Sequence, residues 1–170
     1  LPQQAEEGRN KRRVGLGFLG LGSALVMLGI GYDSEEGRAM AACIAEELRD
    51  AAYAASIQLA REKGPFPLFD AEAYLGGQFV ARLPEALRSE IAEYGIRNSH
   101  LLSIAPTGSI TLAFADNASN GIEPAFSWVY QRKKRMADGS IRSYEVADHA
   151  WRLYRHLGHD VSDEAALPPQ

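Results

Sequence analysis

The sequence predicts an α/β fold in a single domain. Segments with the pattern of short buried strands alternate along the chain with segments of helical periodicity. A length of 170 residues suits one domain, and 46% hydrophobic with 24% charged residues is typical of a soluble globular protein. The net charge of −4 offers no overall basic field, so we expect no nucleic-acid partner.

The first apolar segment is the run VGLGFLGLGSALVMLGIG at residues 14–31, which follows three basic residues. An uncharged run of about 18 residues can just span a bilayer, and basic residues before it are typical of a signal peptide. Six glycines lower the hydrophobicity and the helix propensity of this run together. We therefore expect no membrane segment, but a buried strand at Val14–Leu19, a glycine-rich turn, and a buried helix from about Ser23 to Leu28.

Gly15, Gly17 and Gly20 also match the dinucleotide-binding pattern GxGxxG. That site needs a strand before the first glycine and an acidic residue about 20 positions later. Here Asn10 and three basic residues precede the motif, and the first acidic residue after it, Asp33, comes before a new helix. Close packing of the backbone explains the glycines, while a dinucleotide-binding module stays an alternative.

A long helix is predicted at 34–63, with Asp33 or Ser34 as its cap and Gly64 as its end. Its expected buried stripe is Met40, Ile44, Leu48, Ala51, Ala55 and Leu59. Cys43 lies beside this stripe and is expected to be a small buried hydrophobe. A single cysteine excludes a disulfide within this chain and a cysteine-based zinc site, and it favours a reducing compartment such as the cytoplasm.

Two shorter helices are predicted next. A stiff apolar loop at 65–69 leads to the first, at 70–75, which Gly76 ends. Pro84 suits the first turn of the second helix, and Gly95 ends it. The side chains expected to face inward from this second helix are Leu87, Ile91 and Tyr94.

A strand, a tight turn and a helix start are predicted around residue 105. Leu101–Ala105 has the pattern of a short buried strand, and Ile110–Ala115 can begin a helix. Unpaired N–H groups and the dipole of a first helical turn favour a bound anion. The candidate phosphate loop is Ala105, Pro106, Thr107, Gly108, Ser109 and Ile110, in which two hydroxyls add donors and the glycine permits close approach. The alternative is a helix capped by Ser109 that binds nothing.

The loop Asp116–Pro124 follows, and Asn120-Gly121 within it is a strong turn signal. Its Asn and Asp side chains can support the loop by hydrogen bonds to their own backbone. Glu123 is held extended by the following proline, and it is either an acid/base group or a structural carboxylate.

A hairpin is predicted at about 125–145 and a last helix at about 146–157. Ala125–Tyr130 reads as a strand, Asp138-Gly139 as the turn, and Ile141–Tyr144 pairs back. The basic run Gln131–Arg135 either belongs to a solvated hairpin or attracts a phosphorylated ligand or cofactor. The stripe of the last helix is Ala147, Ala150, Trp151, Tyr154 and Leu157, with Gly158 as its end. His156 and His159 do not suggest zinc, because no third ligand accompanies them.

The string NSHLLSIAPTGSITL, followed by NASNGIEP, resembles the catalytic subunit of ribonucleotide reductases. RRVGLGFLGLGSALVMLG, AREKGPFPLFD and DGS…YEVADHAWRLYR resemble the same family, so the resemblance extends over nearly the whole chain. In that family the turn after this strand binds the phosphates of the substrate through backbone amides and hydroxyls. The form APTGSI resembles the adenosylcobalamin-dependent class (class II). The iron- or manganese-dependent class usually has a turn richer in Ser and Glu here.

The resemblance implies that residues 1–170 are a fragment of the ten-stranded α/β barrel of the catalytic domain. The family makes a thiyl radical on a cysteine loop and uses further cysteine pairs as reductants, and Cys43 matches none of these positions. We therefore expect no catalytic residue and no metal ligand in this segment. Its implied contribution is the phosphate loop 105–110, supported by Asn120, Gly121 and Glu123.

The implied parent enzyme converts ribonucleotides to 2′-deoxyribonucleotides with adenosylcobalamin, which we do not expect the isolated fragment to bind. The expected partners are a ribonucleoside di- or triphosphate and the remainder of the reductase chain, with self-association possible through exposed barrel edges. Leu1 and the tail Ala166–Gln170 suggest an excised segment or a processed product, and a stand-alone domain is the alternative. We expect the isolated chain to be inactive. A non-catalytic structural domain is the remaining alternative function.

Overall fold

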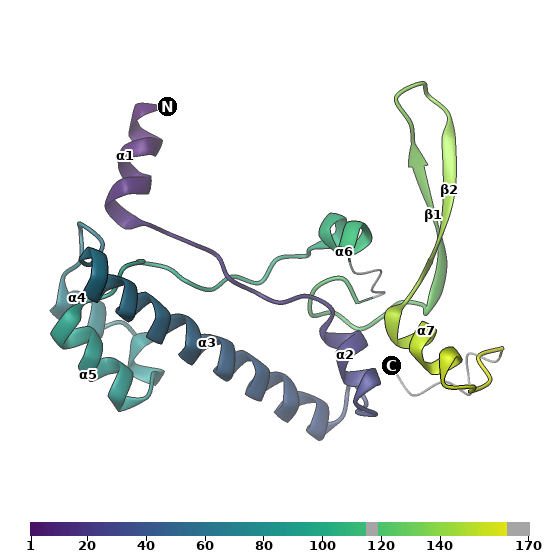
Figure 1. Cartoon of the computed structure of the whole chain (residues 1–170), viewed down its shortest axis with the longest axis horizontal. Helices are drawn as coiled ribbons and strands as arrows, with labels where there is room; N and C mark the ends of the chain where they lie inside the picture. Colours follow the sequence, from purple (N-terminus) through teal and green to yellow (C-terminus); the bar gives the residue numbers. More distant parts are fainter. Residues whose placement is uncertain (115–118, 163–170) are drawn as a thin grey trace. The chain divides into compact units, whose positions relative to one another are not determined.

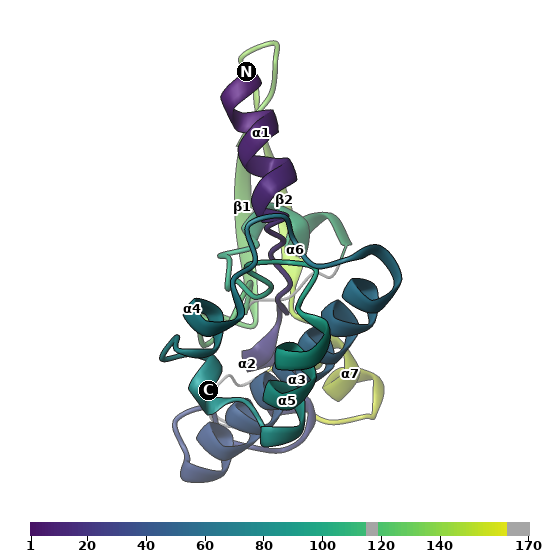
Figure 2. The ribbon, with the colours of Figure 1, turned by 90° about the vertical axis from the view of Figure 1, so that its left-hand side faces the viewer.

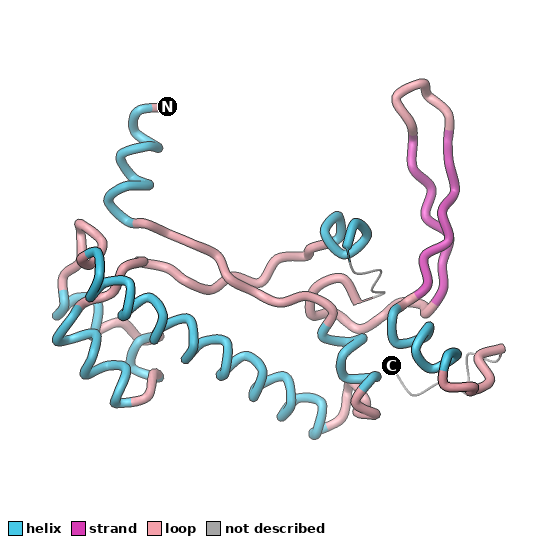
Figure 3. Tube along the Cα trace, in the orientation of Figure 1, coloured by secondary structure: helices cyan, strands magenta, loops and turns pink. Residues whose placement is uncertain are grey.

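The computed structural model describes residues 1–114 and 119–162, except for the side chain of Leu112. The predictions for Ala115, for 116–118 and for the tail 166–170 lie outside the described residues. The elements are α1 (Pro2–Lys11), α2 (Leu21–Met27), α3 (Glu35–Lys63), α4 (Ala71–Leu75), the 3₁₀ helix η1 (Val80–Arg82), α5 (Glu85–Tyr94), α6 (Gly108–Phe114), β1 (Val129–Arg135), β2 (Ile141–Ala147) and α7 (His149–His156) (Figures 1 and 3).

The chain divides into two compact units, which are described separately. The first comprises Leu1–Gly17 and Cys43–Ser103, and the second comprises Phe18–Ala42 and the residues from Ile104 onward. Helix α3 therefore contributes its first turns to the second unit and the remainder to the first. No helix within the described ranges is both long enough and apolar enough to cross a membrane.

The first unit is built around the C-terminal part of α3. Gly64, with φ 77°, ends α3 as predicted, and Asp70 caps α4 by accepting a hydrogen bond from the amide of Ala73 at 2.8 Å. Helix α5 lies beside α3 (Figure 2), and the Arg61–Glu90 ion pair at 3.3 Å joins the two helices. The buried core of this unit is Tyr53, Ile57, Phe66, Val80, Leu83, Ile91, Ile96 and Leu101.

Three predictions about this unit are wrong. The C-terminal half of α3 buries Ala52, Tyr53, Ser56, Ile57 and Ala60, one position along from the predicted Ala51, Ala55 and Leu59. A shift of one residue turns a helix by about 100°, and the larger Tyr53 and Ile57 face the core. Cys43 is exposed, and so is Tyr94, which lies 3.9 Å from the guanidinium carbon of Arg61 instead of facing inward.

The two predicted buried strands, Val14–Leu19 and Leu101–Ala105, do not form full strands. They make one short parallel pairing. The amide of Leu16 donates to the carbonyl of Leu101 at 2.7 Å, and the amide of Ser103 donates to the carbonyl of Leu16 at 2.9 Å. Only the Leu16–Leu102 pair forms a bridge among the described residues. Among the described residues, the segment around Leu16 pairs with one other extended segment, and Leu16 stays 46% exposed.

The glycines of this segment serve close packing, as predicted. A Cβ on Gly17 would lie 2.2 Å from the carbonyl oxygen of Ser103, which excludes any side chain there. Helix α1 and the left-handed Arg12, with φ 48°, precede Gly15 where dinucleotide binding needs a strand. The dinucleotide alternative is therefore contradicted by the local backbone.

The second unit contains the predicted hairpin, displaced along the chain. Strands β1 and β2 are antiparallel, with Val129 opposite Ala147 and Arg135 opposite Ile141. Strand β1 begins at Val129 and not at Ala125, because Ala125 and Trp128 are buried against Ala150 in a small core. The basic run therefore lies within the strand.

The end of the hairpin determines where α7 begins. Ala147 is still paired with β1, so the helix starts at His149 and not near residue 146. The carboxylate of Asp148, which is fully buried, caps α7 by accepting from the amide of Ala150 at 2.7 Å. Leu157, predicted to be inward, is 64% exposed.

Candidate functional site

The candidate site is the turn before α6 in the second unit. The helix begins at Gly108, two residues before the predicted start, and Thr107 precedes it with φ 50°. The carbonyl of Thr107 accepts the amide of Thr111 at 2.9 Å. The amides of Gly108, Ser109 and Ile110 make no backbone hydrogen bond within the described chain, as expected for a first helical turn.

The predicted loop residues differ in their exposure. Ala105, Pro106, Ser109 and Ile110 are exposed, whereas Gly108 is half-buried, as is Thr107. The space above Gly108 is open, because a Cβ built there would meet nothing closer than the side-chain nitrogen of Asn120 at 4.0 Å. A phosphate group could therefore approach the backbone at this point.

Two threonine hydroxyls, one within the loop and one directly after it, hold the loop in place. The Thr107 hydroxyl donates to the carbonyl of Asn120 at 2.6 Å, and the buried Thr111 hydroxyl donates to the same oxygen at 3.0 Å. A hydroxyl has one proton to donate, so Thr107 fixes the loop instead of serving as a free donor. Ser109 is the loop residue whose hydroxyl faces solvent.

Glu123 supports the turn Asn120-Gly121. One carboxylate oxygen accepts the amide of Asn120 at 3.0 Å, and the other accepts the amide of Gly121 at 2.9 Å. Partial burial opposes ionisation of Glu123, but the backbone N–H groups of the turn outweigh it and lower the pKa of the carboxyl. These contacts favour the structural role over the acid/base role.

The turn Asn120-Gly121 lies against the candidate loop. A Cβ on Gly121 would lie 2.8 Å from the carbonyl oxygen of Ala105, so only glycine allows this approach. The side-chain oxygen of Asn120 is buried and has no hydrogen-bond partner among the residues described. Asn120 and Gly121 therefore contact the loop, whereas Glu123 binds the amides of these two residues.

The start of α2 is joined to the same turn, which the sequence did not indicate. The amide of Gly20 donates to the carbonyl of Asn120 at 3.2 Å, and the amide of Leu21 to that of Gly121 at 3.1 Å. The amide of Gly22 donates to the Ser119 hydroxyl at 3.0 Å. A Cβ on Gly22 would lie 3.0 Å from the Ser119 side chain and 3.0 Å from the carbonyl oxygen of Glu123, so a larger residue would have to displace them. The crowded glycines were the one available signal.

A buried polar contact connects α2 with α7 and was also not predicted. The Ser23 hydroxyl donates to the Asp148 carboxylate at 2.6 Å, and both side chains are buried. His159 stacks on the ring of Tyr154 at 4.1 Å. Within residues 1–114 and 119–162 no group of three His, Cys, Asp or Glu side chains could hold a metal ion.

Residues 1–163 match the model of the family described as ribonucleotide reductase, barrel domain. A vitamin B12-dependent ribonucleoside-diphosphate reductase from Mycobacterium tuberculosis is 37% identical over 131 residues, covering 77% of this chain and 16% of the relative. A vitamin B12-dependent ribonucleotide reductase from Agrobacterium fabrum is 32% identical over 206 aligned positions, covering 97% of this chain and 16% of the relative. Ribonucleoside-diphosphate reductase subunit alpha from Treponema pallidum is 32% identical over 130 residues, covering 73% and 15%.

These matches confirm the resemblance that the motifs around Ala105 and Asn120 indicated. The chain spans about 16% of the length of the first two relatives. Because the family model covers nearly all of the chain, the protein belongs to the ribonucleotide reductase barrel-domain family.

Proposed function

We propose that this chain is a segment of a ribonucleotide reductase, which replaces the 2′-hydroxyl of a ribonucleotide by hydrogen through thiyl-radical chemistry. In this proposal the segment contributes part of the ten-stranded α/β barrel and the loop that binds the substrate phosphates. Membership of the barrel-domain family is the observation that carries the proposal. The order of the matching motifs along the chain supports it.

The phosphate loop would act through its backbone. The amides of Gly108, Ser109 and Ile110 have no backbone partner in the part described, and the helix dipole favours negative charge at this end. The exposed Ser109 hydroxyl adds a donor, and the open space at Gly108 admits a phosphate oxygen. The contacts of Asn120, Gly121 and Glu123 would hold these donors ready before the substrate arrives.

The radical chemistry would belong to other parts of the reductase. Cys43 is exposed in the N-terminal third of α3, apart from the loop in sequence and in a different unit. We therefore propose that the catalytic cysteines and the remainder of the barrel come from the rest of the enzyme. The substrate would be a ribonucleoside diphosphate, as the name of the mycobacterial relative suggests. We also propose a cytoplasmic location.

The cofactor of the whole enzyme would be adenosylcobalamin, since two relatives are named as vitamin B12-dependent. We assign no residue of this chain to the cofactor and derive no step through it.

The loop can be tested with Gly108→Ala in the reductase that carries this segment. Alanine fits at this position because a Cβ meets nothing closer than 4.0 Å, yet its methyl group would occupy the approach of the phosphate. We expect substrate affinity to fall at least tenfold, which corresponds to about 1.4 kcal/mol, with an unchanged melting temperature.

The matched control is Gly8→Ala, at a helical glycine where an added Cβ likewise meets nothing. We expect this variant to bind substrate like the wild type. Substrate affinity within twofold of the wild type in Gly108→Ala would exclude the loop as the phosphate site.

A further inference from the structure

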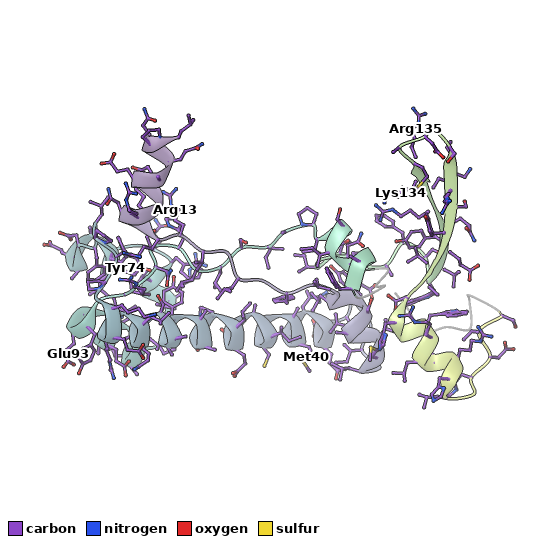
Figure 4. All side chains as sticks on the ribbon, turned by 45° about the horizontal axis from the view of Figure 1, so that its top comes forward. Arg13, Met40, Tyr74, Glu93, Lys134 and Arg135 are labelled. Carbon is purple, nitrogen blue, oxygen red and sulfur yellow. The ribbon has the colours of Figure 1, made fainter. Side chains whose placement is uncertain are left out.

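The hairpin β1–β2 carries a charge opposite in sign to that of the chain. Residues 131–145 contain the five cations Arg132, Lys133, Lys134, Arg135 and Arg142, and only two carboxylates, Asp138 and Glu145. The whole chain has a net charge of −4. Figure 4 labels Lys134 and Arg135 in the part of the hairpin that is distant from α7. A local positive field of this kind attracts anions.

One face of the hairpin collects three of these cations. The register places Arg132 opposite Tyr144 and Lys134 opposite Arg142, and alternation along the strands directs these four side chains to the same face. Like charges directly opposite each other destabilise a strand pair. None of the three cations has an ion pair with a carboxylate of the described residues. The repulsion is therefore uncompensated within this part of the chain.

Two of these cations, Arg132 and Lys134, border a groove that also reaches the candidate loop. Its volume is about 770 Å³, and its walls come from three elements of the second unit. The walls are Ser109 and Ala113 of α6, the run Arg132–Arg135 of β1, and Tyr144–Val146 of β2. A solvated hairpin would explain the exposure of the lysines, but not a cationic face that borders a groove beside Ser109.

We propose that this groove is a second anion site and binds a pyrophosphate-type group, in which two phosphates share a bridging oxygen. Arg132 and Lys134 neutralise its charge, and the hydroxyls of Ser109 and Tyr144 donate hydrogen bonds to it. The group is either the terminal phosphates of a nucleotide or a separate oligophosphate. The nucleotide source rests on the proposed function, whereas the site itself rests on the hairpin and the groove.

The test is calorimetric titration of the 170-residue chain with inorganic pyrophosphate. We expect saturable binding of one pyrophosphate, weakened at least tenfold in the double variant Arg132→Gln/Lys134→Gln. The melting temperature of this variant should stay equal or rise, because Lys134→Gln removes the like-charge pair with Arg142. A loss of binding through unfolding is thereby distinguished from loss of the site.

The control is Arg9→Gln/Arg13→Gln, which changes the net charge equally at exposed positions of the first unit. We expect its pyrophosphate affinity to stay within twofold of the wild type. Absence of saturable binding to the wild type, or equal weakening in both double variants, would overturn the proposal.

Competition between pyrophosphate and ADP identifies the source of the group. Displacement of pyrophosphate by ADP assigns the groove to nucleotide phosphates, and simultaneous binding assigns it to a separate oligophosphate. Both outcomes support the site. Gly108→Ala separates this proposal from the phosphate loop: if it leaves both nucleotide and pyrophosphate binding intact, the loop assignment fails while the groove stands.

Discussion

Glu123 should contribute measurable stability to the turn that supports the candidate loop. In Glu123→Gln the side chain keeps one oxygen acceptor, but loses its charge and its second acceptor, so one of the amides of Asn120 and Gly121 loses its partner. A hydrogen bond to a charged group contributes about 1.5–3 kcal/mol. Because the side chain is only half-buried, we expect Glu123→Gln to destabilise the turn by about 1–2 kcal/mol.

The pH dependence gives this prediction a definite sign. The pKa of Glu123 is lower in the folded chain than its ordinary value of 4.5, because the backbone hydrogen bonds outweigh the effect of burial. The stabilisation is therefore present above pH 4.5 and is lost as the pH falls through the folded-state pKa. Glu123→Gln should therefore lose less stability on acidification than the wild type.

Hydrogen exchange of a peptide covering 119–124 measures the effect directly. At pH 7 we expect exchange in Glu123→Gln to be about 5–30 times faster than in the wild type, as about 1–2 kcal/mol implies. Glu145→Gln, an exposed carboxylate of β2 in the same unit, is the control and should exchange like the wild type. Equal exchange in Glu123→Gln and the wild type at pH 7 would refute the structural role of Glu123.

Two further predictions concern the first unit and are measured by urea denaturation. Ile57→Ala should lower the free energy of unfolding by about 2–5 kcal/mol, because Ile57 is fully buried, whereas Leu59→Ala should lower it by under about 1 kcal/mol. Similar losses in the two variants would contradict the observed buried face of α3. Gly17→Ala should lower the free energy of unfolding by more than about 2 kcal/mol, because its Cβ would overlap the carbonyl oxygen of Ser103. The control Gly8→Ala should raise it by up to about 1 kcal/mol. A neutral Gly17→Ala would show that the parallel pairing does not form.

Local signals predicted the ends of α3 and α5 and the cap of α3. Gly64 and Gly95, both with positive φ, end α3 and α5 where the sequence indicated, and Asp70 caps α4. The predicted cap of α3 was either Asp33 or Ser34, and the Ser34 hydroxyl accepts the amide of Gly37 at 2.9 Å. Such signals act within one turn of chain, so they can be read from neighbouring residues.

Tertiary contacts decided the features that the sequence did not predict. The apolar pattern of Val14–Leu19 suits a buried strand, but one hydrogen-bonding neighbour does not bury it. The hairpin starts at Val129 because Trp128 is taken into a core with Ala150. In the candidate site the loop residues were found from the motif, but the Thr107 hydroxyl bonds Asn120, 13 positions away. Contacts at that separation leave no local pattern.

The most direct test of the phosphate loop is hydrogen exchange of a peptide covering 105–111, with and without a ribonucleoside diphosphate, in the reductase that carries this segment. The amides of Gly108, Ser109 and Ile110 have no backbone partner in the described chain, so they should exchange rapidly without ligand. If they bind the substrate phosphates, saturating nucleotide should slow their exchange at least tenfold, and Gly108→Ala should abolish this protection. Unchanged exchange of this peptide in the nucleotide-saturated enzyme would contradict the assignment.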